Sequence, residues 1–93
     1  MNKKIHTEAV DRLFEAILCL KNKEECYTFF EDICTMKELE TIAQRLVGAK
    51  MLINNNTFNE IVSATGASTT TISRVNRCLQ YGAGGYELVL GQK

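Results

Sequence analysis

The stretch from Thr57 to Leu79 predicts two short helices joined by a tight glycine turn. Thr57 and Glu60 have the spacing of a capping box, in which each side chain bonds the backbone amide of the other at a helix start. Gly66 can take the left-handed conformation that often ends a helix. Ser68 is a good N-cap for the helix that follows. This order of signals is the outline of a helix-turn-helix.

The second of these helices separates apolar from polar residues. Ile72, Val75 and Leu79 share one stripe and predict its buried side. Hydroxyls can donate to phosphates, threonine methyls can touch the thymine methyl, and arginine can bond guanine with two donors. The pattern therefore favours a helix that reads DNA. Its polar residues are Ser68, Thr69, Thr70, Thr71, Ser73, Arg74 and Arg77.

The charge balance leaves a second interpretation open. The chain has 11 basic and 11 acidic residues, and the helix-turn-helix carries only Arg74 and Arg77 against Glu60. Most DNA-binding domains are more basic. A dimer that uses the same small patch twice would still bind DNA. The alternative is a helical interaction module whose helix-turn-helix docks protein instead.

Composition sets further bounds on the class of protein. A chain of 93 residues allows one domain, and the absence of proline favours an all-α fold. We expect no signal peptide, no membrane span and a cytoplasmic protein. The four cysteines form no CxxC pair and His6 stands alone, so we expect no metal and no cofactor. No nucleophile pairs with His6 either, and we expect a protein that is not an enzyme.

Helical periodicity covers the rest of the chain. Thr7 is a candidate cap for a first helix, a second helix is expected near Lys23–Ile33, and Thr35 with Glu38 forms another capping box before the longest helix. The expected inward residues are Val10, Leu13, Phe14, Ile17 and Leu18 in the first helix, Cys26, Phe29, Phe30 and Ile33 in the second, and Leu39, Ile42, Leu46, Ala49 and Ile53 in the third.

The predicted organisation is a single helical domain over residues 1–93. Residues 5–34 supply dimerisation helices, 35–56 a long central helix that ends at three asparagines, 57–81 the helix-turn-helix, and 82–93 a glycine-rich break and tail. The first two helices are more apolar than a peripheral pair needs. Ordinary core packing would explain this, but we favour a homodimer interface, because many helix-turn-helix proteins bind two half-sites as dimers.

The run ECYTFFEDICTMKELETIAQRLVGAKML, followed by GASTTTISRVNRCLQYGAGGY, resembles the Trp repressor superfamily and, within it, the YerC/YecD group of Trp-repressor-related proteins. The resemblance covers roughly residues 5–90. It implies an all-helical, intertwined homodimer that regulates transcription by binding double-stranded DNA. By position, it implies base contacts from Thr69, Thr70 and Ser73, and phosphate contacts from Thr57 and Asn59.

The resemblance also implies a possible site for an amino-acid effector. In Trp repressor two arginines sandwich the indole of bound tryptophan, and Arg45 and Arg74 occupy the matching positions, with Thr35 matching a third ligand residue. Two departures weigh against tryptophan. Val75 replaces a glycine beside the ligand, and Cys78 replaces a serine with a thiol that bonds more weakly. A salt bridge or a phosphate contact is the preferred role for Arg45.

Overall fold

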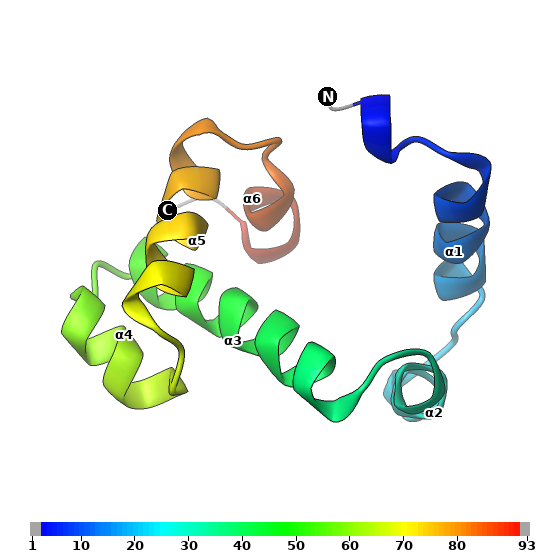
Figure 1. The fold of residues 1–93 in the computed structure, drawn as a ribbon, viewed down its shortest axis with the longest axis horizontal. Coiled ribbons are helices and arrows are strands. Elements are labelled where there is room, and N and C mark those ends of the chain that lie inside the picture. The colour runs from blue at the N-terminus through cyan, green and yellow to red at the C-terminus, as the bar shows by residue number, and fades with distance from the viewer. Residues whose placement is uncertain (1–2, 92–93) are drawn as a thin grey trace. The chain divides into compact units, whose positions relative to one another are not determined.

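The protein is a set of helices joined by short turns (Figure 1). Our computed structural model describes residues 3–91, and the described part contains no β-strand, which confirms the all-α prediction. The chain divides after Met36 into two compact units. The elements are the 3₁₀ helix η1 (Lys3–Ile5) and the α-helices α1 (Glu8–Leu18), α2 (Lys23–Ile33), α3 (Met36–Ile53), α4 (Phe58–Thr65), α5 (Thr69–Tyr81) and α6 (Gly85–Leu90).

The first unit contains α1 and α2, and both begin with a side-chain cap. The hydroxyl of Thr7 accepts from the amide of Val10 at 3.2 Å, as predicted. The carboxamide of Asn22 accepts from the amide of Glu25 at 2.9 Å, and the Glu25 carboxylate accepts from the amide of Lys21 at 2.8 Å. These bonds satisfy amides that a helix start leaves without intrahelical partners.

Neither helix of this unit buries a side chain. No residue of α1 or α2 is buried, and Leu18 is 83% exposed. The prediction that Cys26 and Ile33 point inward is wrong for the single chain, because both are exposed. Phe29 and Phe30 are half-buried and pack edge to face, with ring centroids 5.5 Å apart. Phe14 and Leu18 of α1, which were also expected to point inward, are exposed as well.

The long helix α3 begins directly after Thr35 and ends where the asparagines predicted. Asn55 has φ 67°, a left-handed conformation that asparagine tolerates better than most residues. The amides of Asn55 and Asn56 donate to the carbonyls of Leu52 and Met51, both at 3.0 Å. These bonds satisfy the open end of the helix and turn the chain toward α4.

The helix-turn-helix has the local structure that its sequence predicts. The hydroxyl of Thr57 accepts from the amide of Glu60 at 3.2 Å, and the Glu60 carboxylate accepts from the amide of Thr57 at 2.7 Å. Gly66 ends α4 with φ 76° and donates to the carbonyl of Val62 at 2.9 Å. Ser68 caps α5 through the amide of Thr71 at 3.1 Å.

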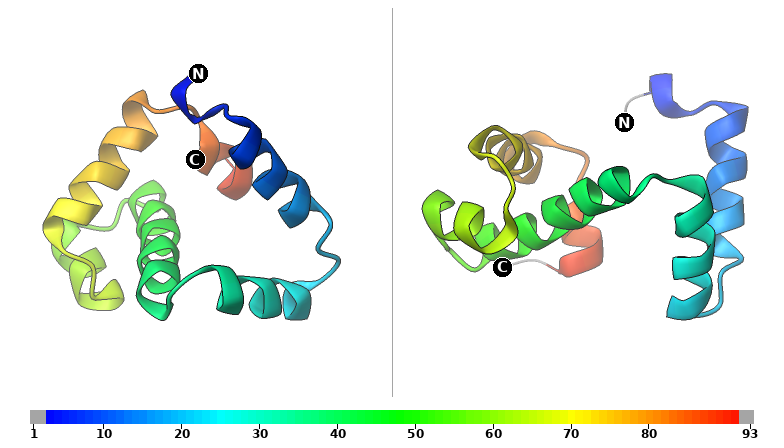
Figure 2. Two further views of the ribbon diagram at one scale, coloured as in Figure 1. Left: turned by 45° about the vertical axis from the view of Figure 1, so that its right-hand side comes forward. Right: turned by 60° about the horizontal axis from the view of Figure 1, so that its bottom comes forward.

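The buried core lies in the second unit, where α4 and α5 pack against the C-terminal half of α3 (Figure 2). Ile61, Ala67 and Ile72 form its centre, and Val75 is also buried. Gly48 of α3 lies directly against this core, because a Cβ there would lie 2.9 Å from Cδ1 of Ile72. Burying an aliphatic side chain of this size contributes about 1.5–3 kcal/mol.

The predicted inward stripe of α3 is only partly covered. Ala49 is buried as expected, and Leu39 and Ile53 are half-buried, but Ile42 is 51% exposed and Leu46 is 41% exposed. The face that packs against the helix-turn-helix is centred on Gly48 and Ala49 instead. A helical repeat fixes which residues share a side and leaves open how much of that side the chain itself covers.

Candidate functional site

The exposed side of α5 carries most of the predicted DNA-contacting residues. Ile72 and Val75 point into the core, which leaves the polar residues of the helix in solvent. The spacing of Thr70, Ser73, Arg74 and Arg77 places them on one face of the helix. The exposed residues of the predicted set on α5 and its cap are Ser68, Thr69, Thr70, Ser73, Arg74 and Arg77.

Two hydroxyls at the start of α5 are occupied with each other. The Ser68 hydroxyl accepts from the Thr71 amide and donates to the Thr71 hydroxyl, each at 3.1 Å. Ser68 therefore has a defined structural role as a cap, and its contact with DNA stays a prediction. Thr69, Thr70 and Ser73 have no side-chain bond of this kind within residues 3–91. Their hydroxyls are thus available to an external partner.

The two arginines of α5 are also unpaired. Between residues 3 and 91, no carboxylate forms an ion pair with Arg74 or Arg77. Helix α5 contains no acidic residue, so nothing on the helix opposes an approaching phosphate. Electrostatic attraction to nucleic acid depends on unneutralised cations of this kind.

The two residues predicted to contact DNA at the start of α4, the cap Thr57 and Asn59, differ in what surrounds them. The Thr57 hydroxyl is used in the capping box, whereas Asn59 is exposed at the first turn of the helix. The Glu60 carboxylate already accepts from the Thr57 amide at 2.7 Å, so a phosphate contact at this end of α4 depends on the Asn59 side chain. Both contacts stay predictions.

A pocket of about 540 Å³ lies between α3, α5 and α6. Arg45 and Cys78 both line it, so the structure brings together two positions that the family resemblance connects with a ligand. Arg74 does not line this pocket, Thr35 belongs to the other unit, and Val75 is buried in the core. The sandwich of a planar ligand between two arginines stays a prediction. The lining residues are Ile42, Arg45, Leu46, Cys78, Gly82, Ala83, Gly85, Tyr86 and Val89.

Sequence analysis did not single out Tyr86, which lines the same pocket. Burial raises the pKa of the Tyr86 phenol, negative charge at Cys78 raises it further, and the Arg45 guanidinium opposes the rise. The phenol therefore stays neutral around pH 7. In the sequence, Tyr86 is marked only as an aromatic residue directly after two glycines. That pattern does not predict which residues Tyr86 contacts.

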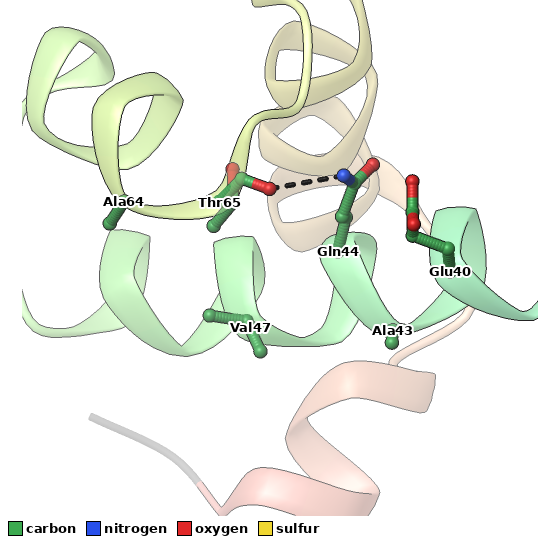
Figure 3. Close-up of a pocket in the computed structure, with 6 residues that line it drawn as sticks. All are labelled: Glu40, Ala43, Gln44, Val47, Ala64 and Thr65. Carbon is green, nitrogen blue, oxygen red and sulfur yellow. Dashed lines mark hydrogen bonds between the residues drawn. The ribbon is translucent and has the colours of Figure 1, made fainter.

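A shallow groove of about 470 Å³ lies between α3 and the end of α4 (Figure 3). In its wall, the side-chain amide of Gln44 donates to the backbone carbonyl of Thr65 at 3.0 Å. This bond joins residues 21 positions apart and links the central helix to the turn. No local sequence pattern could have predicted it.

The described residues show few features of other classes of site. Within residues 3–91 no cluster of histidine, cysteine or carboxylate side chains could hold a metal ion, and no helix is long and apolar enough to cross a membrane. Cys19, Cys26 and Cys78 are exposed thiols and Cys34 is half-buried.

Comparison with known proteins matches this arrangement to one family. The model of the Trp repressor protein family matches residues 8–93. The chain belongs to the Trp repressor family. The protein is 53% identical over 87 residues to the uncharacterized protein YerC of Bacillus subtilis (strain 168), covering 94% of this chain and 84% of YerC. The predicted resemblance to this group is thereby confirmed.

Solved structures show the same fold. A TrpR-like protein from Eubacterium eligens ATCC 27750 superposes with a TM-score of 0.92 at 53% identity, over 96% of this chain and 92% of its own. A candidate Trp repressor from Staphylococcus aureus also superposes with a TM-score of 0.92, at 48% identity, over 97% of this chain and 91% of its own. Family membership supports, at the level of the family, a helical DNA-binding regulator.

Proposed function

We propose that this protein is a cytoplasmic, sequence-specific transcriptional regulator that binds double-stranded DNA as a homodimer. The observation that carries the proposal is the exposed face of α5. Thr69, Thr70, Ser73, Arg74 and Arg77 all lie in solvent on a helix whose opposite side is anchored in the core. A rigid helix with such a face fits the major groove, and membership in a repressor family supports the same function.

In the proposed mechanism, each copy inserts α5 into one of two successive major grooves. Thr69, Thr70, Ser73 and Arg77 read base edges, and Arg74 with the start of α4 holds phosphates. The two half-sites then lie about 34–36 Å apart, which is one turn of B-form DNA. The mechanism needs no catalytic group, cofactor or metal ion.

Exposed apolar side chains support the dimer. Each unit leaves large hydrophobic residues in solvent, and in unit 2 they extend over α3 and α6. Surfaces of this kind on a single chain mark interaction sites. The most exposed are Leu18, Tyr27, Met36, Tyr81, Leu88 and Val89.

Selection of bound sequences from random duplexes tests the function directly. The proposal predicts enrichment of a two-fold symmetric site with half-sites one helical turn apart. The same selection with added tryptophan tests the effector, and identical enrichment with and without it would argue against tryptophan. A library that emerges with no preferred sequence would overturn the proposal.

The protein-docking alternative is distinguished by a salt titration. Each phosphate contact by a cation contributes about 0.9 to the slope of log affinity against log salt concentration, so Arg74 of each copy predicts a dimer slope of about −2. A slope near zero on mixed duplexes, with no retained DNA, would instead favour a helix-turn-helix that binds protein. The observation behind this alternative is the small positive charge of the segment.

A further inference from the structure

We infer that Gln44 of α3 is a positioning residue for DNA recognition, because it fixes the turn that sets the direction of α5. The inference rests on the proposed function, and it assigns a role to a residue that lies on neither helix of the helix-turn-helix. It begins from one bond, in which Nε2 of Gln44 donates to the backbone oxygen of Thr65 at 3.0 Å (Figure 3).

The bonded carbonyl lies at the place where the chain leaves α4. The last carbonyls of a helix lack intrahelical donors and need partners from elsewhere. The amide of Gly66 bonds the carbonyl of Val62 at 2.9 Å, and the hydroxyl of Thr65 donates to the carbonyl of Ile61 at 2.8 Å. Gln44 supplies the donor for the carbonyl of Thr65, the last residue of α4. The last turn of α4 has no basic residue, so the amide also meets the negative end of the helix dipole.

The turn between the Thr65 carbonyl and the start of α5 is very short. Thr65 uses its hydroxyl to accept from the amide of Ala67 at 3.1 Å, and Ser68 then caps α5. Only Gly66 and Ala67 separate the bonded carbonyl from this cap. A movement of Thr65 is therefore transmitted directly to the first turn of α5, where Thr69 and Thr70 are exposed.

The hydrogen bond from Gln44 adds a directional restraint that the apolar contacts between the helices do not provide. Ile61, Ala67 and Ile72 hold the helices together, but hydrophobic contact is non-directional. A hydrogen bond has a preferred direction and therefore restrains rotation as well as distance. Gln44 and Gly48 lie one turn apart on the same face of α3. The close approach at Gly48 brings α3 near enough for Gln44 to reach the turn.

The test compares Gln44→Met with the wild-type protein and with Thr41→Val. Methionine keeps the length and helix preference of glutamine but removes the donor. Thr41→Val is the matched control, because its hydroxyl donates to the Lys37 carbonyl within α3 at 2.9 Å and does not reach the turn. For each protein, affinity is measured for the selected duplex and for a scrambled duplex at one salt concentration.

We expect the ratio of specific to non-specific affinity to fall roughly five- to tenfold in Gln44→Met, the factor that one hydrogen bond of this kind represents. Gln44→Glu, which places a carboxylate against the carbonyl, should lower the ratio further. The ratio should stay within about twofold of wild type in Thr41→Val. Equal loss of affinity for both duplexes, or the same fall in the control, would overturn the inference, because a purely structural residue gives those results.

Amide hydrogen exchange provides a readout that needs no DNA. In Gln44→Met the amides of Gly66 and Ala67 should exchange several times faster than in wild type, while amides at the centre of α3 keep their rates. In the wild-type protein the side-chain amide of Gln44 should exchange more slowly than that of exposed Gln80. If the wild-type protein binds DNA without sequence preference, the proposed function fails. The exchange rates of the Gly66 and Ala67 amides then decide alone whether Gln44 fixes the turn. Unchanged rates would then reject it.

Discussion

The helix-turn-helix and the N-terminal helices α1 and α2 begin with equally good caps but differ in what their apolar sides contact. Around α4 and α5, Ile61, Ile72 and Val75 are fully buried and Gly48 lets a third helix approach. In α1 and α2 no residue is buried. Caps decide where a helix begins, whereas a stable position in the fold requires an apolar partner. The helix-turn-helix has that partner within its own unit, whereas α1 and α2 need an apolar partner from outside their unit.

The largest expected effect comes from breaking the region that has its own core. Ile72→Ala removes a fully buried side chain at the contact of α3, α4 and α5. We expect the free energy of unfolding to fall by about 2–5 kcal/mol. Urea denaturation followed by circular dichroism measures it. Thr70→Ala, on the exposed side of the same helix, is the control and should change stability by less than about 0.5 kcal/mol.

The second prediction addresses the region without a core. Phe14 is 52% exposed on the apolar stripe of α1, and Phe14→Glu should weaken the proposed dimer by about 2 kcal/mol or more, as expected for an aromatic side chain at an interface. Sedimentation velocity at several concentrations gives the dissociation constant. Glu15→Gln, at the exposed neighbouring position, should leave it unchanged. A wild-type protein that sediments as a monomer at every concentration would contradict the dimer itself.

The third prediction sharpens the comparison at Gly48. Gly48→Val adds a branched side chain where even a Cβ lies 2.9 Å from Ile72, so we expect a loss of about 1–3 kcal/mol from overpacking. Gly48→Ala should be close to neutral, because the mobile end of Ile72 can yield and alanine gains about 1 kcal/mol in helix preference. Equal stability of the two variants in urea would show that α3 does not approach this closely.

The fourth prediction separates the two helices of the DNA-binding region. Thr70→Ala should change base preference at one position of the half-site by about 1 kcal/mol, while Asn59→Ala should weaken binding to all sequences alike. Affinity measured across a randomised site library distinguishes them. If both variants lose the same affinity at every sequence, this division between base reading and phosphate contact is wrong.

The smallest expected effect is the pH dependence of the capping box. The Thr57 amide, which donates to the Glu60 carboxylate, lowers the pKa of Glu60 below its usual 4.5, and Asn56 adds to the effect. A depressed pKa stabilises the fold above the unfolded value, and this contribution is lost as the pH falls through the folded value. Urea midpoints at pH 7 and pH 3.5 should therefore differ more in wild type than in Glu60→Gln, whose amide oxygen still accepts but does not titrate. An identical pH response of the two proteins would show that Glu60 is not the titrating group.

Local signals account for the parts of the fold that the sequence predicted well. The bounds of α2, the capping box at Thr57, the left-handed Gly66 and the cap at Ser68 depend on residues within one turn of each other. The family resemblance, carried by residues along most of the chain, is confirmed by the family match. Side chains on α5 were assigned to the solvent side because Ile72 and Val75 fixed the opposite side.

Contacts between distant residues account for what was missed. Neither the close approach at Gly48 nor the bond from Gln44 to Thr65 has a local signature, since each depends on how two helices meet. Exposure of Ile42 and Leu46 was not foreseen either, because a helical stripe gives no information about its cover.

The short separations within the helix-turn-helix core have a kinetic consequence. Ile61, Ala67 and Ile72 meet across only a few intervening residues, and contacts so close in sequence form rapidly because little loop entropy opposes them. We expect this part of the chain to assemble early in folding. The N-terminal helices would then be ordered in a later step whose rate depends on protein concentration. Refolding measured at two protein concentrations should show a fast phase whose rate is the same at both, from the helix-turn-helix core. It should also show a slower phase whose rate changes with concentration, from the N-terminal helices.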